Sequence, residues 1–436
     1  MAPRSSRREG DGHEHKRNDG EAPVSIIGFG AAGFNTAIAL RTSGYTGPIR
    51  VFSDIDTLPY SPILTSYYAA GELDYEECFP WSQAEVDELD LDIVHEGPVT
   101  KLDTKGHRVH TAQGDYLYSK CVIASGSVPT PVGFPRDCGY EPIMLRTMDD
   151  AKRLKDAITN PGCRRMLVSG TSMVSLKTVE ACLNRGVEVT LVGIMDHVLD
   201  MNALPQAAER FERGLAAQGV TLKLANPIKA VEVIADDGHP LGRRLEVTFA
   251  NGDVESFDEI FVAHGMRNNL EFVEEGSLAL DRGVLVDEFM RSSDPDVYAA
   301  GDVVQATELI SGDKRIVGIW KNAALQGACA GKAIAAELAD KTPTSAFAAS
   351  LAMNTITVRD TLFISAGTIQ LTDSSRVETE VGDTMTVVRI FEDDGDASRL
   401  VGFNITCDVD EPGGDAYDLG AMLTMRIRED CARAGK

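Results

Sequence analysis

The chain has 436 residues, of which 43% are hydrophobic and 25% are charged, and it carries a formal net charge of −25 at pH 7. Such a chain is long enough for two or three domains with a substantial core, and its acidic charge disfavours nucleic acid and anionic membrane surfaces as partners. No apolar stretch approaches the ~18 residues that cross a bilayer, so we expect a soluble, cytoplasmic protein.

A glycine-rich turn follows the first apolar strand, residues 24–27, and leads into a helical run that ends near Arg41. The residues of this turn are small and are expected to contact a cofactor: Gly28, Gly30, Ala31, Ala32 and Gly33. The first glycine permits the tight turn, the second lets backbone amides approach a pyrophosphate, and the third lets the helix lie against the strand. A strand, a GxGxxG turn and a helix in this order predict a dinucleotide site.

An acidic residue follows the next apolar strand of this first crossover. Asp54 stands about 20 residues beyond Gly33, which is the spacing expected for a carboxylate on the adenosine ribose. Much farther along the chain, Gly301 and Asp302 end another strand of small residues. Because a carboxylate after a glycine can approach sugar hydroxyls, we interpret the two acids as the two ends of one dinucleotide site.

Irregular and extended segments lie between these two acids. Residues 58–62 hold two prolines and are expected to be irregular rather than helical. Residues 91–119 alternate in the manner of antiparallel strands, and residues 120–129 indicate a buried strand that ends in a small-residue turn. That turn contains Ala124, Ser125 and Gly126.

A second crossover begins near Arg164. It consists of an apolar strand over residues 166–168, a turn at Gly170, a helix through Leu183 and a strand over residues 187–192. The chain therefore contains a second, internally related unit of the dinucleotide-binding type.

Four segments occur in a fixed order along the chain: residues 28–33, 58–60, 123–129 and 298–302. They resemble the FAD-dependent pyridine nucleotide-disulfide oxidoreductases, and within them the ferredoxin reductases, the rubredoxin reductases and the flavin portion of nitrite reductases. The resemblance covers roughly residue 24 to the C-terminus.

This resemblance implies that the chain binds FAD. It places the first glycine turn at the pyrophosphate, Asp54 at the adenosine ribose and Asp302 at the ribityl chain. The turn of Ala124, Ser125 and Gly126, together with Gly301, would lie beside the cofactor. Trp320 falls where ferredoxin reductases place an aromatic residue beside the isoalloxazine, and an ordinary core aromatic is the alternative.

The predicted fold is α/β, with two Rossmann-like dinucleotide-binding domains, one for FAD and one NAD-like, and a C-terminal α+β domain. Residues 1–22 are polar and are expected to form a disordered tail. The FAD domain is expected in two parts, residues 23–147 and 271–341. The NAD(P)-like domain would cover residues 148–270, and the C-terminal interface domain residues 342–436.

The second glycine turn departs from the family pattern GxGxxGxE, because Ser172, Ser175 and Lys177 replace two glycines and the acid. The first serine would crowd the pyrophosphate and the second would separate the helix from the strand. The next strand ends at Gly193, where the acid for the NADH ribose is missing. We therefore expect NAD(P)H binding to be weakened or lost.

Lys177 and His264 are the candidate catalytic residues at the flavin. Lys177 would bind a substrate carboxylate or polarise a carbonyl, with a solvated helical lysine as the alternative. His264 lies in a turn that resembles the family's AxGxRPN and could transfer protons near neutral pH, with a structural histidine as the alternative. The eight cysteines are scattered without a CxxC or CxxxxC pair, so we expect no disulfide framework, no thiol redox chemistry and no metal site.

Three functions follow as alternatives. The first is an FAD-dependent oxidoreductase that exchanges a hydride or electron pair with a small organic substrate bound in the altered nicotinamide cleft. The second is an NAD(P)H-dependent reductase that passes electrons to a ferredoxin or rubredoxin carrier. The third is a non-catalytic, flavin-holding subunit of a complex. In the resembling enzymes the C-terminal domain often mediates dimerisation, so a homodimer is expected unless the chain is a subunit of a complex.

Overall fold

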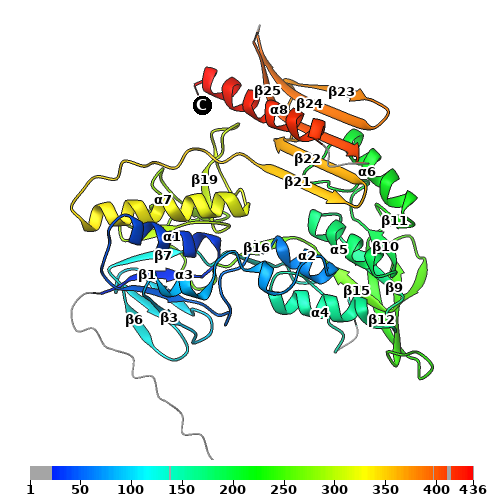
Figure 1. Cartoon of the computed structure of the whole chain (residues 1–436), viewed down its shortest axis with the longest axis horizontal. Coiled ribbons are helices and arrows are strands. Elements are labelled where there is room, and N and C mark those ends of the chain that lie inside the picture. The colour runs from blue at the N-terminus through cyan, green and yellow to red at the C-terminus, as the bar shows by residue number, and fades with distance from the viewer. Residues whose placement is uncertain (1–21, 137–138, 396, 410–413, 436) are drawn as a thin grey trace, which may run out of the picture.

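A computed structural model describes residues 22–136, 139–395, 397–409 and 414–435. Figure 1 shows three parts: a first α/β domain at the lower left, a second α/β domain at the lower right and a C-terminal domain at the top. The predicted fold class, two Rossmann-like domains followed by an α+β domain, is confirmed. Among the described residues, no helix is both long and apolar enough to span a membrane.

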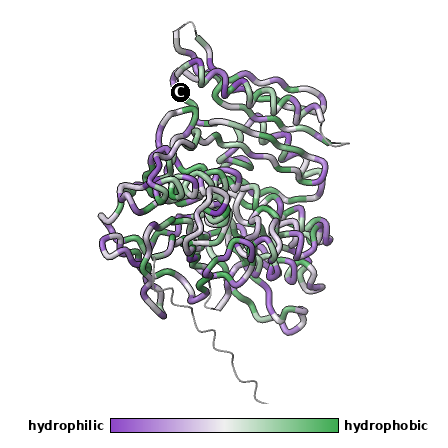
Figure 2. The backbone as a smooth tube through the Cα atoms, turned by 60° about the vertical axis from the view of Figure 1, so that its left-hand side comes forward, coloured by the Kyte–Doolittle hydropathy of each residue, from purple (hydrophilic) through white to green (hydrophobic). Residues whose placement is uncertain are grey.

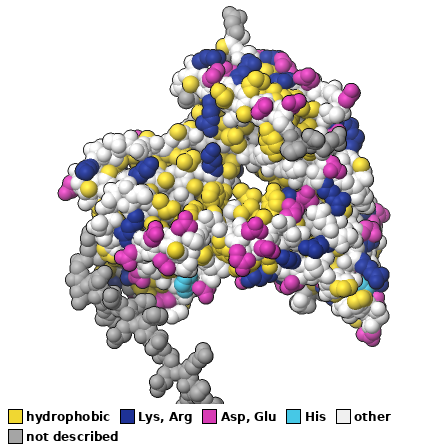
Figure 3. All heavy atoms as spheres, viewed as in Figure 1, with side chains coloured by type: hydrophobic (Ala, Val, Ile, Leu, Met, Phe, Trp, Pro, Cys, Tyr) yellow, Lys and Arg dark blue, Asp and Glu magenta, His cyan; other side chains and the backbone are white. Residues whose placement is uncertain are grey.

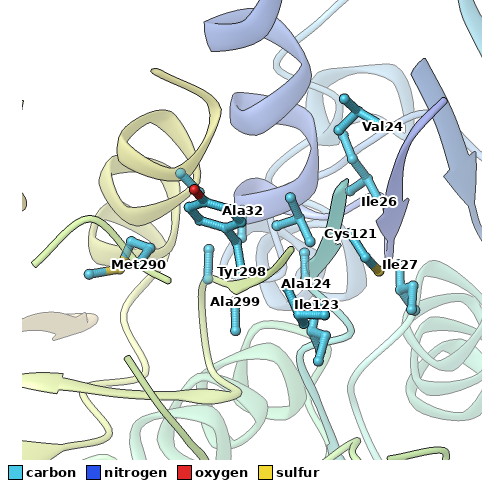
Figure 4. Packing of buried hydrophobic residues seen from close by; sticks show 14 of the residues in the cluster. Val24, Ile26, Ile27, Ala32, Cys121, Ile123, Ala124, Met290, Tyr298 and Ala299 are labelled. Carbon is cyan, nitrogen blue, oxygen red and sulfur yellow. The ribbon is translucent and has the colours of Figure 1, made fainter. Parts of the chain in front are cut away.

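The first domain is built on a parallel sheet with the strand order β18-β7-β1-β2-β3. These strands are β1 (Val24–Ile27), β2 (Ile49–Phe52), β3 (Leu91–Val94), β7 (Lys120–Ile123) and β18 (Val297–Ala299). Their short apolar runs fit a sheet that is buried on both faces. Figure 4 shows side chains of β1, β7 and β18 close to one another and to Ala32. The last strand comes from far along the chain, so the domain is assembled from two separate segments, as the sequence predicts.

Two helices cover this sheet and contact each other closely. They are α1 (Ala31–Thr42) and α7 (Trp320–Leu338), and the Thr36 hydroxyl donates to the Gly327 carbonyl at 3.1 Å. The smaller helices of this part of the chain are α2 (Leu64–Ala70), which packs against the second domain, a 3-10 helix (Glu76–Cys78) and α3 (Gln83–Asp87). Two small sheets complete the domain: β4 (Lys101–Asp103), β5 (Arg108–His110) and β6 (Asp115–Leu117); β17 (Val284–Leu285), β19 (Val304–Thr307) and β20 (Lys314–Arg315).

The second domain repeats the architecture with the parallel strand order β11-β10-β9-β15. Its sheet and helices are β9 (Arg165–Ser169), β10 (Glu188–Val192), β11 (Thr221–Lys223), β15 (Glu259–Val262), α4 (Met148–Thr159), α5 (Met173–Asn184) and α6 (Pro205–Ala217). An antiparallel sheet of β12 (Ile228–Ala235), β13 (Arg243–Phe249) and β14 (Val254–Phe257) follows. Two short strands, β8 (Ser127–Pro129) and β16 (Met266–Asn268), pair with each other and connect the two domains.

The C-terminal domain is an antiparallel sheet with the order β21-β22-β25-β24-β23 and one long helix. Its elements are β21 (Met353–Val358), β22 (Thr361–Gly367), β23 (Ser375–Val381), β24 (Met385–Asp394), β25 (Ala397–Asp408) and α8 (Gly414–Arg433). Figure 2 shows hydrophobic stretches recurring in all three parts of the chain, which agrees with separate hydrophobic cores in the first and C-terminal domains.

Candidate functional site

The first crossover brings two of its glycines into close backbone contact. Gly28 has a φ of +105°, and a Cβ at this position would lie 2.3 Å from the carbonyl oxygen of Ala124. A Cβ on Gly33 would lie 2.0 Å from the carbonyl oxygen of Gly28, so α1 can pack here only without a side chain. Gly30 differs, because no atom lies within 4 Å of its Cβ position. That open space at the amino end of α1 is where an anionic phosphate would be favoured.

The two predicted acids lie at the same edge of the first sheet. Asp54 is exposed just after β2, and Asp302 follows β18. Because all strands of this sheet are parallel, their carboxyl ends share one edge, and β1 and β7 lie between the two acids. An extended dinucleotide along this edge would therefore pass from Asp54 over Gly30 toward Asp302.

Asp302 is held by side chains from two other segments. Ser127 donates to its Oδ2 at 2.7 Å, and a guanidinium nitrogen of Arg146 lies 3.7 Å from the same atom. The preceding residue, Gly301, has a φ of +87° and donates its amide to Gln326 Oε1 at 2.8 Å. Arg146 was not among the predicted site residues, and its signal in the sequence is only its place just before the Thr147–Asp150 capping box that begins α4.

Aromatic side chains gather at the start of α7. Trp320 is the first residue of this helix and stacks on Trp81, with ring centroids 6.0 Å apart and planes 22° apart. The Trp81 ring in turn packs against the ring of Phe34 of α1, with centroids 4.3 Å apart. The indole N–H of Trp320 is buried without a hydrogen-bond partner among the described residues. A buried donor without a partner calls for a bound acceptor, so this cluster and the open space at Gly30 both fit a bound flavin nucleotide.

The second crossover forms despite its two serines. Gly170 has a φ of +119°, as the turn requires, and Ser175 is fully buried beneath it. Ser172 caps α5, because its hydroxyl accepts the amide of Ser175 at 3.4 Å. The serine side chain thus occupies an amide that a pyrophosphate could otherwise use.

His264 lies at the carboxyl edge of the second sheet, where β9 and β15 are neighbours. The His264 Nε2 is 2.8 Å from the Ser169 hydroxyl at the end of β9. The ring of Phe134 lies edge-on to the imidazole, with ring centroids 6.1 Å apart. Burial lowers the pKa of the imidazole. β9 and β15 run parallel, so Ser169 and His264 lie side by side at the carboxyl ends of the strands, the edge at which open α/β sheets bind ligands.

Lys177 lies away from these groups, inside the protein. Its ammonium forms an ion pair with Glu180 one turn later, and both side chains are less than a tenth exposed. The ring of Tyr67 on α2 lies 4.1 Å from the ammonium, and the other Glu180 oxygen accepts the amide of Arg359 in the C-terminal domain. These contacts join α5 to α2 and to the C-terminal domain, and they leave the expectation that Lys177 meets a substrate carboxylate without support.

Hydrogen bonds join the carboxyl edge of the first sheet to the segment that returns from the second domain. The segment after β15 lies on the turn after β7, where the Asn269 amide donates to Gly126 at 3.0 Å and the Ser125 hydroxyl donates to Asn269 at 2.6 Å. The candidate sites of the two domains therefore face a common region. Figure 3 shows hydrophobic side chains around a hollow at the centre of this face, between the three parts.

The residues that the structure describes gather no set of metal ligands, and their cysteines are buried. These residues contain no group of three or more His, Cys, Asp or Glu side chains that could hold a metal ion. The seven described cysteines are buried and no disulfide joins any two of them, and burial raises the pKa of Cys78 and Cys182. Cys138 and the tail residues 1–21 lie outside the described residues.

Comparison with known proteins places the chain among redox enzymes. The family model described as pyridine nucleotide-disulphide oxidoreductase matches residues 22–327. An NADH oxidase from Methanocaldococcus jannaschii is 26% identical over 71% of this chain and 69% of its own length. A rubredoxin-NAD(+) reductase from Pseudomonas putida is 29% identical over 66% of this chain and 74% of its own length.

Solved structures of similar size share this fold. A covalent complex of putidaredoxin reductase with putidaredoxin contains a chain that matches with a TM-score of 0.77 and 21% identity, covering 93% of each chain. The match includes the C-terminal domain, which the family model does not reach.

Proposed function

The chain belongs to the pyridine nucleotide-disulphide oxidoreductase family, and on that premise we propose that this flavin-dependent oxidoreductase oxidises NADH or NADPH through FAD and passes the electrons to a small redox protein. The observation that carries the proposal is the hydrogen-bonded contact between the turn of Ser125 and Gly126 at the edge of the first sheet and Asn269 in the segment that returns from the second domain. It supports an arrangement in which two dinucleotide crossovers lie near one region, as hydride exchange between two nucleotides requires.

Each group of residues has a part in this proposal. Gly30 and the amino end of α1 would hold the FAD pyrophosphate, Asp54 the adenosine ribose and Asp302 the ribityl chain. FAD would supply the reversible uptake of a hydride. The second crossover at Gly170 would hold the nicotinamide nucleotide, and His264 would line that cleft as a neutral imidazole that can exchange protons with Ser169.

The direct reaction with a small organic substrate, which the altered second turn suggested, has less support. The relatives are named as an NADH oxidase and a rubredoxin-NAD(+) reductase. The serines are accommodated within an intact crossover, with Ser172 as a helix cap and Ser175 inside the core. We therefore prefer a second site that still takes NAD(P)H, with affinity reduced by Ser172.

Steady-state kinetics with a protein acceptor test this function. Reduction of rubredoxin or ferredoxin should proceed with NADH or NADPH and saturate with the carrier. In Ser172→Gly, the KM for the nucleotide should fall several-fold with little change in kcat, because the amide at the amino end of α5 becomes free for the pyrophosphate. Ser175→Ala is the matched control, since that side chain is buried beneath the turn, and its KM should stay as in the parent.

The outcome also separates the alternatives. If neither NADH nor NADPH supports reduction of any carrier, and a small organic donor does reduce the flavin, the direct-substrate reaction is restored. If oxygen oxidises NADH rapidly and no carrier accelerates the reaction, the protein is an oxidase. The Methanocaldococcus relative is named as one. FAD that no donor reduces would support a flavin-holding subunit.

A further inference from the structure

Arg146 occupies the crossing from the first domain into the second. Its backbone is fixed on both sides, because its amide donates to Asp150 Oδ2 at 3.0 Å and its carbonyl accepts from the Tyr60 hydroxyl at 3.3 Å. Burial raises the pKa of Tyr60 to about 12, so that phenol stays a donor at neutral pH. The segment therefore presents the Arg146 side chain from a pinned backbone.

The guanidinium points into the candidate flavin site. Nη2 lies 3.7 Å from Asp302 Oδ2 and 3.2 Å from the position that a Cβ on Gly126 would take. Gly126 belongs to the turn expected beside FAD, and Asp302 is the acid expected at the ribityl chain. The side chain is 29% exposed, so its charge acts in a partly water-excluded environment.

The charge of Arg146 is only loosely balanced. Asp302 is its ion-pair partner among the described residues, and Oδ2 of Asp302 already accepts the shorter hydrogen bond from Ser127 at 2.7 Å. A nitrogen 3.7 Å from the oxygen is beyond hydrogen-bond distance. The guanidinium thus keeps donors and positive charge available to a ligand in the site.

The order of the site along the sheet edge shows which part of the dinucleotide that charge meets. The adenosine end is expected at Asp54 beside β2, and the ribityl chain at Asp302 beyond β18. The ring system must lie beyond the ribityl chain, past Asp302, and the Arg146 guanidinium lies beside this acid.

Resting on the proposed function, we propose that Arg146 stabilises the negative charge that a flavin ring gains when it accepts a nucleophile or a hydride. The guanidinium cannot be deprotonated at working pH and is weakly hydrated, so it suits this task in a partly buried site. Its presence would raise the affinity of the flavin for electrons and favour transfer from the nicotinamide nucleotide.

Sulfite provides a probe that needs neither NADH nor a carrier. The sulfur lone pair of sulfite forms a bond to N5 of the oxidised flavin while the N5=C4a π bond breaks, and the displaced electron pair gives the ring its negative charge at N1 and the C2 oxygen without an external reductant. The dissociation constant of sulfite should rise at least about tenfold in Arg146→Gln, the equivalent of one pKa unit of lost charge stabilisation. Arg146→Lys should stay within about threefold of the parent, because the charge is kept.

A pH series makes the lysine variant decisive even where the glutamine variant does not retain FAD. As pH rises toward ~10, lysine loses its proton whereas arginine does not, so sulfite binding by Arg146→Lys should weaken and that by the parent should not. Equal sulfite affinity in parent and Arg146→Gln, or a lysine variant that follows the parent at all pH values, would overturn the proposal. Failure of both nucleotides to reduce a flavin that sulfite still titrates would reject the proposed function and leave the role of Arg146 standing.

Discussion

At the scale of single residues, Lys177 and Glu180 form a buried pair that ties the second domain to its neighbours. Tyr67 comes from α2, which packs on the second domain, and Arg359 from the turn between β21 and β22. Removing one partner of a buried ion pair leaves an uncompensated charge, which is more damaging than replacing both partners. The pair is thus placed to hold α2 and the C-terminal domain against α5.

Lys177→Met should therefore act on stability rather than on the chemical step. We expect the free energy of unfolding to fall by about 3 kcal/mol, and the double variant Lys177→Met/Glu180→Gln to recover most of that loss. Denaturant unfolding measures both effects, alongside the rate of flavin reduction. A single variant of unchanged stability that holds FAD but is no longer reduced would return Lys177 to the chemistry.

His264 gives stability a specific dependence on pH. Burial lowers the pKa of this histidine in the folded chain, so between ~6.5 and the lower folded value the unfolded chain binds the additional proton. The contribution of this histidine to the unfolding free energy is complete above about pH 6.5 and is lost as the pH falls from there through the folded pKa. The difference in unfolding free energy between about pH 7.5 and about pH 5.5 should be smaller in His264→Gln than in the parent, and an equal difference would refute the assignment.

At the scale of elements, the first crossover separates the glycine needed for folding from the glycine available to a ligand. Ala at position 33 would bring its Cβ onto the Gly28 carbonyl, whereas Ala at position 30 meets nothing within 4 Å. Gly33→Ala should lose more than about 2 kcal/mol of stability through overpacking.

Gly30→Ala is the matched variant at the same turn. Its stability should stay within about 0.5 kcal/mol of the parent, while its FAD dissociation constant, read from flavin fluorescence, rises at least about tenfold because the methyl group occupies the phosphate approach. An unchanged FAD affinity would mean that the pyrophosphate does not approach Gly30.

The elements near the glycine turns could be predicted from the sequence, because strand, turn and helix signals there are local. Both crossovers, the late return of β18 and the α+β domain are present as expected. The partners that complete the sites could not be predicted, since Arg146, Trp81 and Ser169 reach them only through tertiary contacts. Ser172 was expected to obstruct its turn, whereas the structure uses it as a helix cap, a role for which serine at a helix start is a preferred residue.

At the scale of the whole molecule, the C-terminal domain is fastened to the second domain through Arg210 on α6. This buried guanidinium donates to Asp408 at 2.6 Å, to the Gly382 carbonyl at 2.6 Å and to Thr386 at 3.1 Å. Lysine cannot reproduce such a fork of donors.

Arg210→Lys should weaken this attachment without altering the flavin site. We expect a loss of about 3 kcal/mol, detected as earlier hydrogen exchange in β23, β24 and α6, with the visible flavin spectrum unchanged. Arg213→Lys on the same helix is the control, because Arg213 is exposed and pairs only with Glu209 among the described residues. Equal exchange in the two variants would contradict the fastening role.

The central claim is that a nicotinamide nucleotide in the second domain reduces a flavin held by the first. An anaerobic titration of the FAD-loaded protein with NADH, and in parallel with NADPH, tests it most directly through the flavin absorbance. One equivalent of at least one nucleotide should bleach the oxidised band within the turnover time. Flavin that stays oxidised with an excess of both nucleotides, yet is reduced by dithionite, would contradict the claim.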